Sequence, residues 1–396
     1  MSFFSIKKES DVVLVFDIGS GSVGGALVLT SKTHTPTILY TFRSEIPFVQ
    51  EVTGVRLLSL MLRSLSQVTH ALVHEGFGLT GLHYRHAGKM EVVVSLGAPW
   101  VVSRTSFLSL RNKVPSEITS HIFSELLKHS NEETRPKEKD IPKDAVQIDR
   151  RLIKSVLNGY VTSSPFGKNA SEAEFAAFQS FSIPKVTEKI SATIMEHIRP
   201  RSLHFHAFSL LAFLTIGKLL PVVEDFIIVD ASGEQTELSL IRKGALAETA
   251  TFPLGKHHLI RELKLHTEVP HAGAPALLAL HAENKGDGQL FKRSKEGLDS
   301  GKLAWRKEFI SSLSFISDEV FLPKSIFLCV DADVVSIFKD AILAADWNRF
   351  SLTQSNLQLV TVTDELIGPL IRYSSPEGHD CFLGLISASL PQLFKD

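Results

Sequence analysis

The chain has 396 residues, 44% hydrophobic and 21% charged, so it can bury a sizeable core in two domains or in one domain with large insertions. Its 42 Lys and Arg residues against 43 Asp and Glu residues leave a formal net charge of -1, which excludes a global attraction to nucleic acid or acidic lipid. Two cysteines, Cys329 and Cys381, are too few for a disulfide scaffold or a four-cysteine zinc site, and they fit a reducing cytoplasm.

The most informative stretch reads VVLVFDIGSGSVGGALVL and lies near the start of the chain. The apolar run before Asp17 predicts a buried strand, and a turn of Gly and Ser residues leads to a second apolar segment. Gly19 and Gly21 carry no Cβ, so the backbone N–H groups of this turn can approach phosphate oxygens, and Ser20 and Ser22 add hydroxyl groups. Asp17, at the end of the strand, is placed to hold Mg²⁺ directly or through water.

Two other interpretations of this stretch compete with a phosphate site. Gly19, Gly21 and Gly24 match the dinucleotide pattern GxGxxG, but that pattern needs a helix at the turn and an acidic residue roughly twenty positions on. Here the turn leads into strand-like segments and the nearest acid is Glu45, which disfavours the dinucleotide interpretation. The other alternative is a tight hairpin without a ligand, because Gly and Ser are ordinary turn residues.

The segments that follow predict an α/β layer with an insertion. Up to residue 198 we expect strands at 38–42, 90–96 and 172–180 and helices at 57–74, 116–128 and 184–198. A charged, proline-punctuated loop lies after the second of these helices. We therefore expect a first subdomain over 1–99 and a small inserted α+β subdomain over 100–198.

The opening pattern then occurs a second time. After a mostly apolar helix expected over 204–220, a strand ends in Asp230, and VDASGEQTELSLIRKGAL again combines an Asp, a small polar turn and a second strand. Aligning Asp17 with Asp230 brings Ser20 onto Gly233. A hairpin duplicated in two domains would let both carboxylates face one cleft, where a nucleotide phosphate and its magnesium could bind.

The remainder of the second half also alternates strands with helices. We expect strands at 245–252, 325–330 and 357–362 and helices at 256–264, 274–281, 298–319 and 334–344. The helix that follows Gly255 has an N-terminus suited to an anion. These elements place 199–396 in a second domain, with the end of the chain either there or returning to the first.

Other candidate groups favour ordinary roles. Lys256 and Arg261 are expected to be solvated helix charges instead of contacts to a phosphate or an acidic partner. No GxSxG nucleophile elbow is present. The histidines of the second half lack HxxxH spacing on a clear helix and are expected at the surface or at helix caps: His257, His258, His266, His271 and His281.

Several segments resemble the actin-like ATPases. FDIGSGSVGGALVL resembles their first phosphate motif, VDASGEQTELSLIRKGAL resembles the second, and FPLGKHHLIRELK is similar to the stretch that follows in the branch of the cell-division protein FtsA and the pilus-assembly protein PilM. The insertion is similar in placement to the small SHS2-like subdomain of that branch, NGYVTSSPFGK is similar to FtsA there, and CFLGLISAS is similar to the chain end of PilM. The resemblance implies a two-domain actin-like fold, RNase H-like and duplicated, of the α/β class with a small α+β inserted subdomain.

The same resemblance implies a site for ATP and Mg²⁺. Asp17 and Asp230 would be its two magnesium-facing carboxylates. The other nucleotide-binding residues that it implies are Gly19, Ser20, Gly21 and Ser22 in the first turn, Ser232, Gly233, Gln235 and Thr236 in the second, and Gly255.

Three departures from the family pattern predict a weak or degenerate ATP site. The second turn keeps Gly233 alone, beside the anionic Glu234, where the family usually has consecutive glycines. His206 is nearest the position where the family often has an acidic residue that orients water. Val330 and Asp331 replace the usual glycine pair of the adenosine site.

The resemblance implies a cytoplasmic scaffold that recruits partners at the inner membrane face in cell division or pilus assembly, either nucleotide-gated or with a degenerate ATP site. The implied partner is a protein, either the cytoplasmic peptide of a membrane protein or a tubulin-like division protein, and self-association is open. No nucleic-acid partner and no transmembrane span are expected. The closing SLPQLFKD is too short and mixed for the amphipathic helix that ends FtsA, which favours a membrane-protein peptide. Two alternatives stay open: an active ATPase or phosphotransferase, and a degenerate fold that binds no nucleotide.

Overall fold

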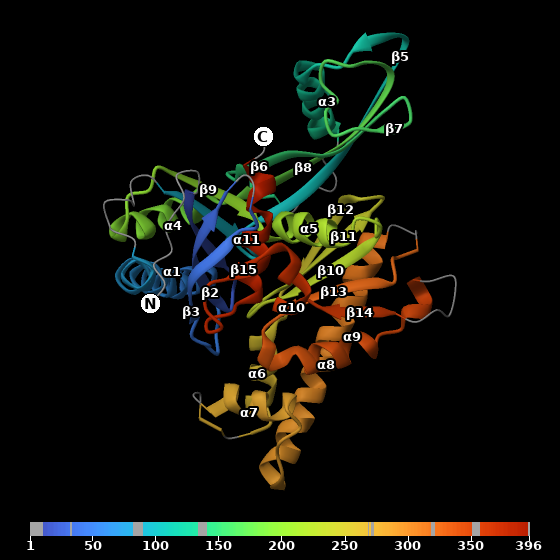
Figure 1. Ribbon diagram of the computed structural model, residues 1–396. Helices are drawn as coiled ribbons and strands as arrows, with labels where there is room; N and C mark the ends of the chain where they lie inside the picture. Colours follow the sequence, from blue (N-terminus) through green and yellow to red (C-terminus); the bar gives the residue numbers. More distant parts are fainter. Residues whose placement is uncertain are drawn as a thin grey trace.

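The computed structural model describes residues 11–31, 34–81, 90–133, 141–267, 269–270, 273–317, 321–350 and 357–394. These residues form three β-sheets (Figure 1). Two of the sheets are the centres of two α/β halves, and the third belongs to a subdomain that projects away from them.

The first half is built on a mixed six-stranded sheet in the order β15-β3-β2-β1-β4-β9. Its strands are β1 (Asp11–Ile18), β2 (Ser22–Thr30), β3 (Thr37–Glu45), β4 (Glu91–Leu96), β9 (Ser202–Ala207) and β15 (Arg372–Tyr373). β1, β2 and β3 are antiparallel neighbours, whereas β4 runs parallel to β1 and β9 parallel to β4. Both edge strands come from beyond residue 198, so the later part of the chain contributes to this sheet.

The second half repeats this topology. Its strands, in the order β12-β11-β10-β13-β14, are β10 (Phe226–Ala231), β11 (Thr236–Arg242), β12 (Ala245–Phe252), β13 (Ser325–Val330) and β14 (Gln358–Thr361). Order and directions match those of β3-β2-β1-β4-β9. Asp17 and Asp230 are each the second-last residue of their central strand, opposite Gly24 and Glu237. The predicted duplicated hairpin is therefore confirmed.

Helices separate and cover the two sheets. They are α1 (Gly54–Ala71), continued by a π-helical turn (Leu72–Gly76) and α2 (Phe77–Thr80), then α4 (Pro184–His197), α5 (Phe208–Leu219), α6 (Lys256–Leu265), α7 (Ala274–Ala282), α8 (Gly288–Ser317), α9 (Val335–Leu343), α10 (Asp364–Ile367) and α11 (Cys381–Leu393). α1 packs against α4, β2 and β3, while α5 and α11 pack together against the other side of this sheet (Figure 1).

Side chains alternate along β10 and connect two cores. Phe226 and Ile228 belong to the core shared with the first sheet, α5 and α11. Ile227 and Val229 point the other way, into a core with α6, α8 and α9. The Asp at the end of β10 is therefore held on a strand that is buried on both faces.

The inserted subdomain has its own sheet and core. Its elements are β5 (Val102–Glu117), α3 (Ser120–Glu133), β6 (Val146–Leu157), β7 (Tyr160–Val161) and β8 (Asn169–Ser182), with the strand order β5-β8-β6-β7. The helix expected from Ser116 begins instead at Ser120. After a bulge, Ser116 and Glu117 still pair with β8, and the Thr119 hydroxyl accepts the Ile122 N–H as a cap.

Two further helix predictions were wrong in their starts. The helix expected from His204 is preceded by β9, because parallel pairing with β4 holds 202–207 extended and α5 begins only at Phe208. α8 begins at Gly288 instead of Leu298, ten residues earlier than its apolar pattern indicated. Within the described ranges, no helix has both the length and the apolar character needed to cross a membrane.

Candidate functional site

The turns of the two duplicated hairpins touch each other across the boundary between the halves. The Ser20 N–H donates to Ser232 Oγ at 3.1 Å, and Ser20 Oγ accepts the Glu234 N–H at 2.9 Å. Ser20 is completely buried by these contacts. The N–H and hydroxyl groups of Ser20, which were expected to bind phosphate, are therefore hydrogen-bonded to the opposite turn. The Gly19 N–H donates instead to the Ser22 carbonyl, and Ser22 Oγ accepts from Arg43.

Glycine is required at the centre of this contact. A Cβ built on Gly233 would lie 2.4 Å from Gly21 Cα, and one built on Gly21 would lie 2.9 Å from Gly233 Cα. Both distances are shorter than real Cβ contacts allow, so the absence of side chains lets backbone meet backbone here. Gly21 and Gly233 approach each other instead of leaving a gap for a ligand.

The second turn also fills the N-terminus of α6. The N–H groups of Lys256 and His257 donate to the carbonyls of Ser232 and Gly233 at 2.9 and 2.8 Å. A Cβ on Gly255 would lie 2.2 Å from the Ser232 carbonyl oxygen, so this close approach needs glycine. Backbone carbonyls occupy the helix terminus that the sequence suggested for an anion.

The other residues predicted to bind nucleotide also make hydrogen bonds within this chain. The Gly19 carbonyl accepts Trp100 Nε1–H at 2.8 Å, and the Gln235 carbonyl accepts the Ser232 N–H at 3.0 Å. The Thr236 hydroxyl donates to the Leu254 carbonyl at 2.7 Å and accepts Trp305 Nε1–H at 2.9 Å. Thr236 thus lies inside the second core, away from the cleft.

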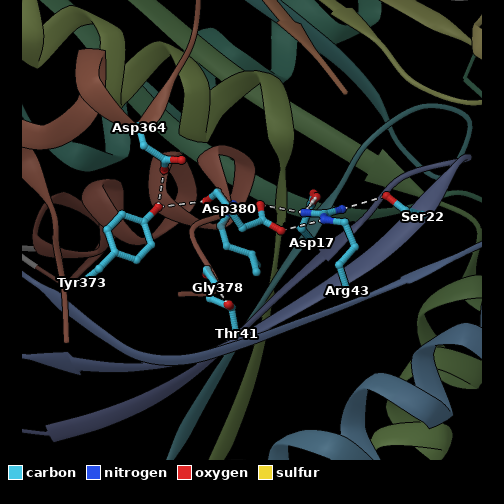
Figure 2. A network of polar contacts seen from close by, with 9 residues as sticks. Asp17, Ser22, Thr41, Arg43, Asp364, Tyr373, Gly378 and Asp380 are labelled. Atoms are coloured by element: carbon cyan, nitrogen blue, oxygen red, sulfur yellow. Dashed lines mark hydrogen bonds and ion pairs between the residues drawn. The ribbon is translucent and has the colours of Figure 1, made fainter. Parts of the chain in front are cut away.

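Arg43 on β3 binds the Asp17 carboxylate (Figure 2). Its Nη2 lies 2.9 Å from Asp17 Oδ2, and its Nη1 donates to Ser22 Oγ at 2.8 Å. Its Nε and Nη2 also contact the two carboxylate oxygens of Asp380 at 2.7 and 3.0 Å. Burial opposes the charge of Arg43, but the Asp380 and Asp17 carboxylates outweigh it and raise the pKa of Arg43 well above its ordinary value.

The chain-terminal helix supplies the second carboxylate. Asp380 caps α11 by accepting the Leu383 N–H at 3.0 Å. Burial opposes its ionisation, but Arg43 lowers the pKa of Asp380 below its ordinary value. The loop before it is held by the Tyr373 hydroxyl, which lies 2.5 Å from Asp364 Oδ1 and 3.0 Å from the Asp380 carbonyl (Figure 2).

Sequence reasoning missed Arg43 and Asp380, although a signal for Arg43 exists. Asp17, Gly24 and Arg43 are register neighbours on three adjacent strands. A Cβ on Gly24 would lie 2.6 Å from Arg43 Nη2, so Gly24 leaves the space through which the guanidinium crosses β2 to reach Asp17. The sequence signal for this contact was Gly24, a glycine inside a buried strand, together with the charged Arg43 on the next strand.

Asp230 lies beside the small space that remains between the halves. This cavity has a volume of about 20 Å³ and is lined by Asp17, Asp230, Asp331, Arg43 and neighbouring backbone, with Phe208 and Phe382. Burial, together with the nearby Glu237 and Asp17 carboxylates, raises the pKa of Asp230 well above its ordinary value. Glu237, opposite it on β11, is also buried, and burial raises its pKa to about 7.

Internal ion pairs occupy the charged residues around the cavity. Lys256, only 8% exposed, lies 3.1 Å from Asp331 and 2.9 Å from Asp333. Glu234 turns away from the cleft to His257, at 2.9 Å, and to Arg261. The expectation that Lys256 and Arg261 are solvated charges was wrong, because both bind carboxylates of this chain.

The predicted histidines lie in different environments, and His257 and His281 are buried instead of at the surface. His257 is buried against Glu234, His258 lies half-buried in α6, His266 contacts the Glu262 carbonyl at 3.0 Å, and His281 contacts Ser294 at 2.7 Å. His271 lies outside the described residues. His206 is on β9, with Nδ1 2.6 Å from Asp149 Oδ1. Over the described part of the chain, no three His, Cys, Asp or Glu side chains are grouped to hold a metal ion.

ATP with Mg²⁺ does not fit this site in the conformation described. The cavity between the halves, with a volume near 20 Å³, holds about one water molecule. Arg43 covers the Asp17 carboxylate, and the two turns bond to each other where phosphates would lie. Entry of a nucleotide would require the two halves to separate.

Comparisons with known proteins bear on the fold. No family model and no curated protein matches the sequence. Among solved structures, the chain is similar to PilM in the PilM-PilN type IV pilus biogenesis complex, at 13% identity, covering 96% of this chain and 98% of that chain with a TM-score of 0.60. The likeness to PilM shows that the two chains share a fold.

Two weaker likenesses to solved structures have TM-scores of 0.41 and 0.38. The first is to ethanolamine utilization protein EutJ from Carboxydothermus hydrogenoformans, 12% identical, covering 96% of this chain and 89% of that one. The second is to a Bacteroides thetaiotaomicron protein with an actin-like ATPase fold and unknown function, 10% identical, covering 94% and 96%.

Proposed function

We propose that this chain, which has the actin-like ATPase fold of PilM, is a cytoplasmic scaffold that recruits a protein partner at the inner membrane face and does not turn over ATP. The observation that carries the proposal is the direct contact between the two hairpin turns. A catalytic nucleotide site must hold phosphates between these turns, but here they bury each other. What remains for function is the shape of the fold and its outer surface.

A protein partner is favoured by the similar structure itself, which is a complex of PilM with PilN. We infer by analogy that the partner of this chain is the cytoplasmic peptide of a membrane protein in a pilus-type assembly. A tubulin-like division protein and self-association are the other outcomes that a binding experiment would distinguish.

The partner proposal is tested by passing detergent-solubilised inner membranes over the immobilised chain. We expect retention of a membrane protein whose isolated cytoplasmic peptide then binds in a direct titration. A retained tubulin-like protein would place the scaffold in division instead of pilus assembly. If no purified candidate binds directly, the scaffold proposal is wrong.

The second candidate function is an active ATPase or phosphotransferase. It is favoured by one observation: Asp17 and Asp230 line the same cavity, as the family resemblance implies for magnesium-facing carboxylates. In that case an opened form would bind nucleotide through the residues named above, including Gly19, Ser232 and Gly255. Magnesium-dependent phosphate release that Asp17→Ala abolishes would support this candidate, and we expect none from the wild type.

A further inference from the structure

The site between the halves has its own cation, Arg43. Arg43 is the only basic side chain among the described residues that line the cavity between the halves. It contacts Asp17 and Asp380 at the same time, so one guanidinium compensates two carboxylates that come from β1 and from the start of α11. Its side chain is 20% exposed, and those of Asp17 and Asp380 are 9% and 13% exposed.

The surroundings hold Arg43 in this place. Gly24 gives it room to cross β2, Ser22 Oγ accepts its Nη1–H, and the Phe382 ring lies 5.4 Å from its Cζ. A planar guanidinium with several donors suits two carboxylates and a hydroxyl better than a flexible ammonium does. The space and the hydrogen-bond acceptors around Arg43 therefore match an arginine side chain.

We propose that Arg43 is a built-in counter-cation, which takes the place of a divalent metal at Asp17 and ties the chain-terminal helix α11 to the first hairpin without a nucleotide. The proposal rests on the scaffold function above, because it explains how the first half of the actin-like fold can hold two buried carboxylates together without a bound metal. Arg43 is a positioning residue in this account, and its removal exposes a latent site for a divalent cation.

The number of carboxylates around Arg43 supports its role as a counter-cation. Without Arg43, Asp17 and Asp380 would face each other in a buried space, and Asp230 and Asp331 line the same cavity as Asp17. Removing one partner of a buried ion pair is strongly destabilising because the other charge is left uncompensated. A small hard cation is the species that could restore the balance.

The test compares the thermal unfolding midpoint of the full chain with and without millimolar Mg²⁺, in the absence of nucleotide. For the wild type we expect no response to Mg²⁺. Arg43→Gln should lower the midpoint by about 5 °C or more, and Mg²⁺ should restore about a third of that loss. The double variant Arg43→Gln with Asp17→Asn is the matched control, and it should not respond to Mg²⁺.

A milder variant keeps the test decisive if Arg43→Gln does not fold. Gly24→Ala leaves every charge in place but pushes the guanidinium away from Asp17, so it too should lower the midpoint and acquire a response to Mg²⁺. Equal responses of the wild type and the variants, or variants as stable as the wild type, would overturn the assignment. Failure of the scaffold function is distinct, because it appears in the direct titration as the absence of any purified partner that binds.

Discussion

Replacing Gly233 by alanine should force the two hairpin turns apart. Its Cβ would lie 2.4 Å from Gly21 Cα and 2.7 Å from Gly21 N, and both are backbone atoms that cannot rotate away. Ordinary contacts need about 3.4 Å or more, so the turns must separate by roughly 1 Å. The Ser20 hydrogen bonds of 3.1 and 2.9 Å would then lengthen beyond useful geometry.

The expected loss adds two contributions. Two hydrogen bonds are worth about 1 kcal/mol each, and overpacking costs about 1–3 kcal/mol, so Gly233→Ala should destabilise the chain by roughly 3–5 kcal/mol. The control is Gly217→Ala in α5, where a Cβ meets nothing within 4 Å. That change should be neutral or stabilising by about 0.5–1 kcal/mol, since alanine favours a helix.

Urea unfolding followed by circular dichroism measures both variants, and hydrogen exchange of the 19–21 and 232–235 amides locates the effect. Gly233→Ala should unfold at lower urea and exchange faster in both turns. If it matches the stability of Gly217→Ala, the turns do not touch as described.

Two further substitutions test the buried charges. Burial raises the pKa of Glu237 to about 7, so the folded state retains a proton that the unfolded state releases near its ordinary pKa of 4.5. The resulting stability is fully present below about pH 4.5 and is lost as pH rises from there through about 7. Glu237→Gln should therefore be more stable than the wild type at pH 8, by on the order of 2 kcal/mol, and this gain should vanish below about pH 5. A gain that does not change with pH would contradict the raised pKa of Glu237. Lys256→Ala should lower the free energy of unfolding by about 3 kcal/mol, because Asp331 loses its partner. The control Lys285→Ala removes an exposed pair with Glu283 and should cost under about 0.5 kcal/mol in the same urea titration. Equal losses in the two variants would refute the pairing of Lys256 with Asp331.

The duplicated hairpins were predictable because their signals are local. Apolar runs, an Asp at a strand end and a Gly-Ser turn occur together in both, and the structure places Asp17 and Asp230 at equivalent positions. The start of α5 was not predictable in the same way. Phe205 is the one strongly strand-favouring residue in the short stretch before α5 and does not by itself predict a strand. The pairing of β9 with β4, across the whole insertion, decides the conformation of this stretch.

The closed site was beyond sequence reasoning for a similar reason. The glycines and serines of a turn suit phosphate oxygens and another turn equally well, because both readings need close backbone approach and free N–H groups. Whether the turn binds phosphate or the other turn depends on how closely the two halves approach, and the turns are more than two hundred residues apart in the chain. Likewise Asp380 joins Arg43 only because the end of the chain packs back onto the first sheet.

The account depends most directly on whether the wild type binds nucleotide. Isothermal titration calorimetry of the full chain with ATP and Mg²⁺ measures this without assuming turnover. We predict no saturable heat at millimolar ATP, because the hairpin turns and Arg43 fill the site. Micromolar binding that Asp17→Ala weakens would contradict the account and would show that the two halves open to admit the nucleotide.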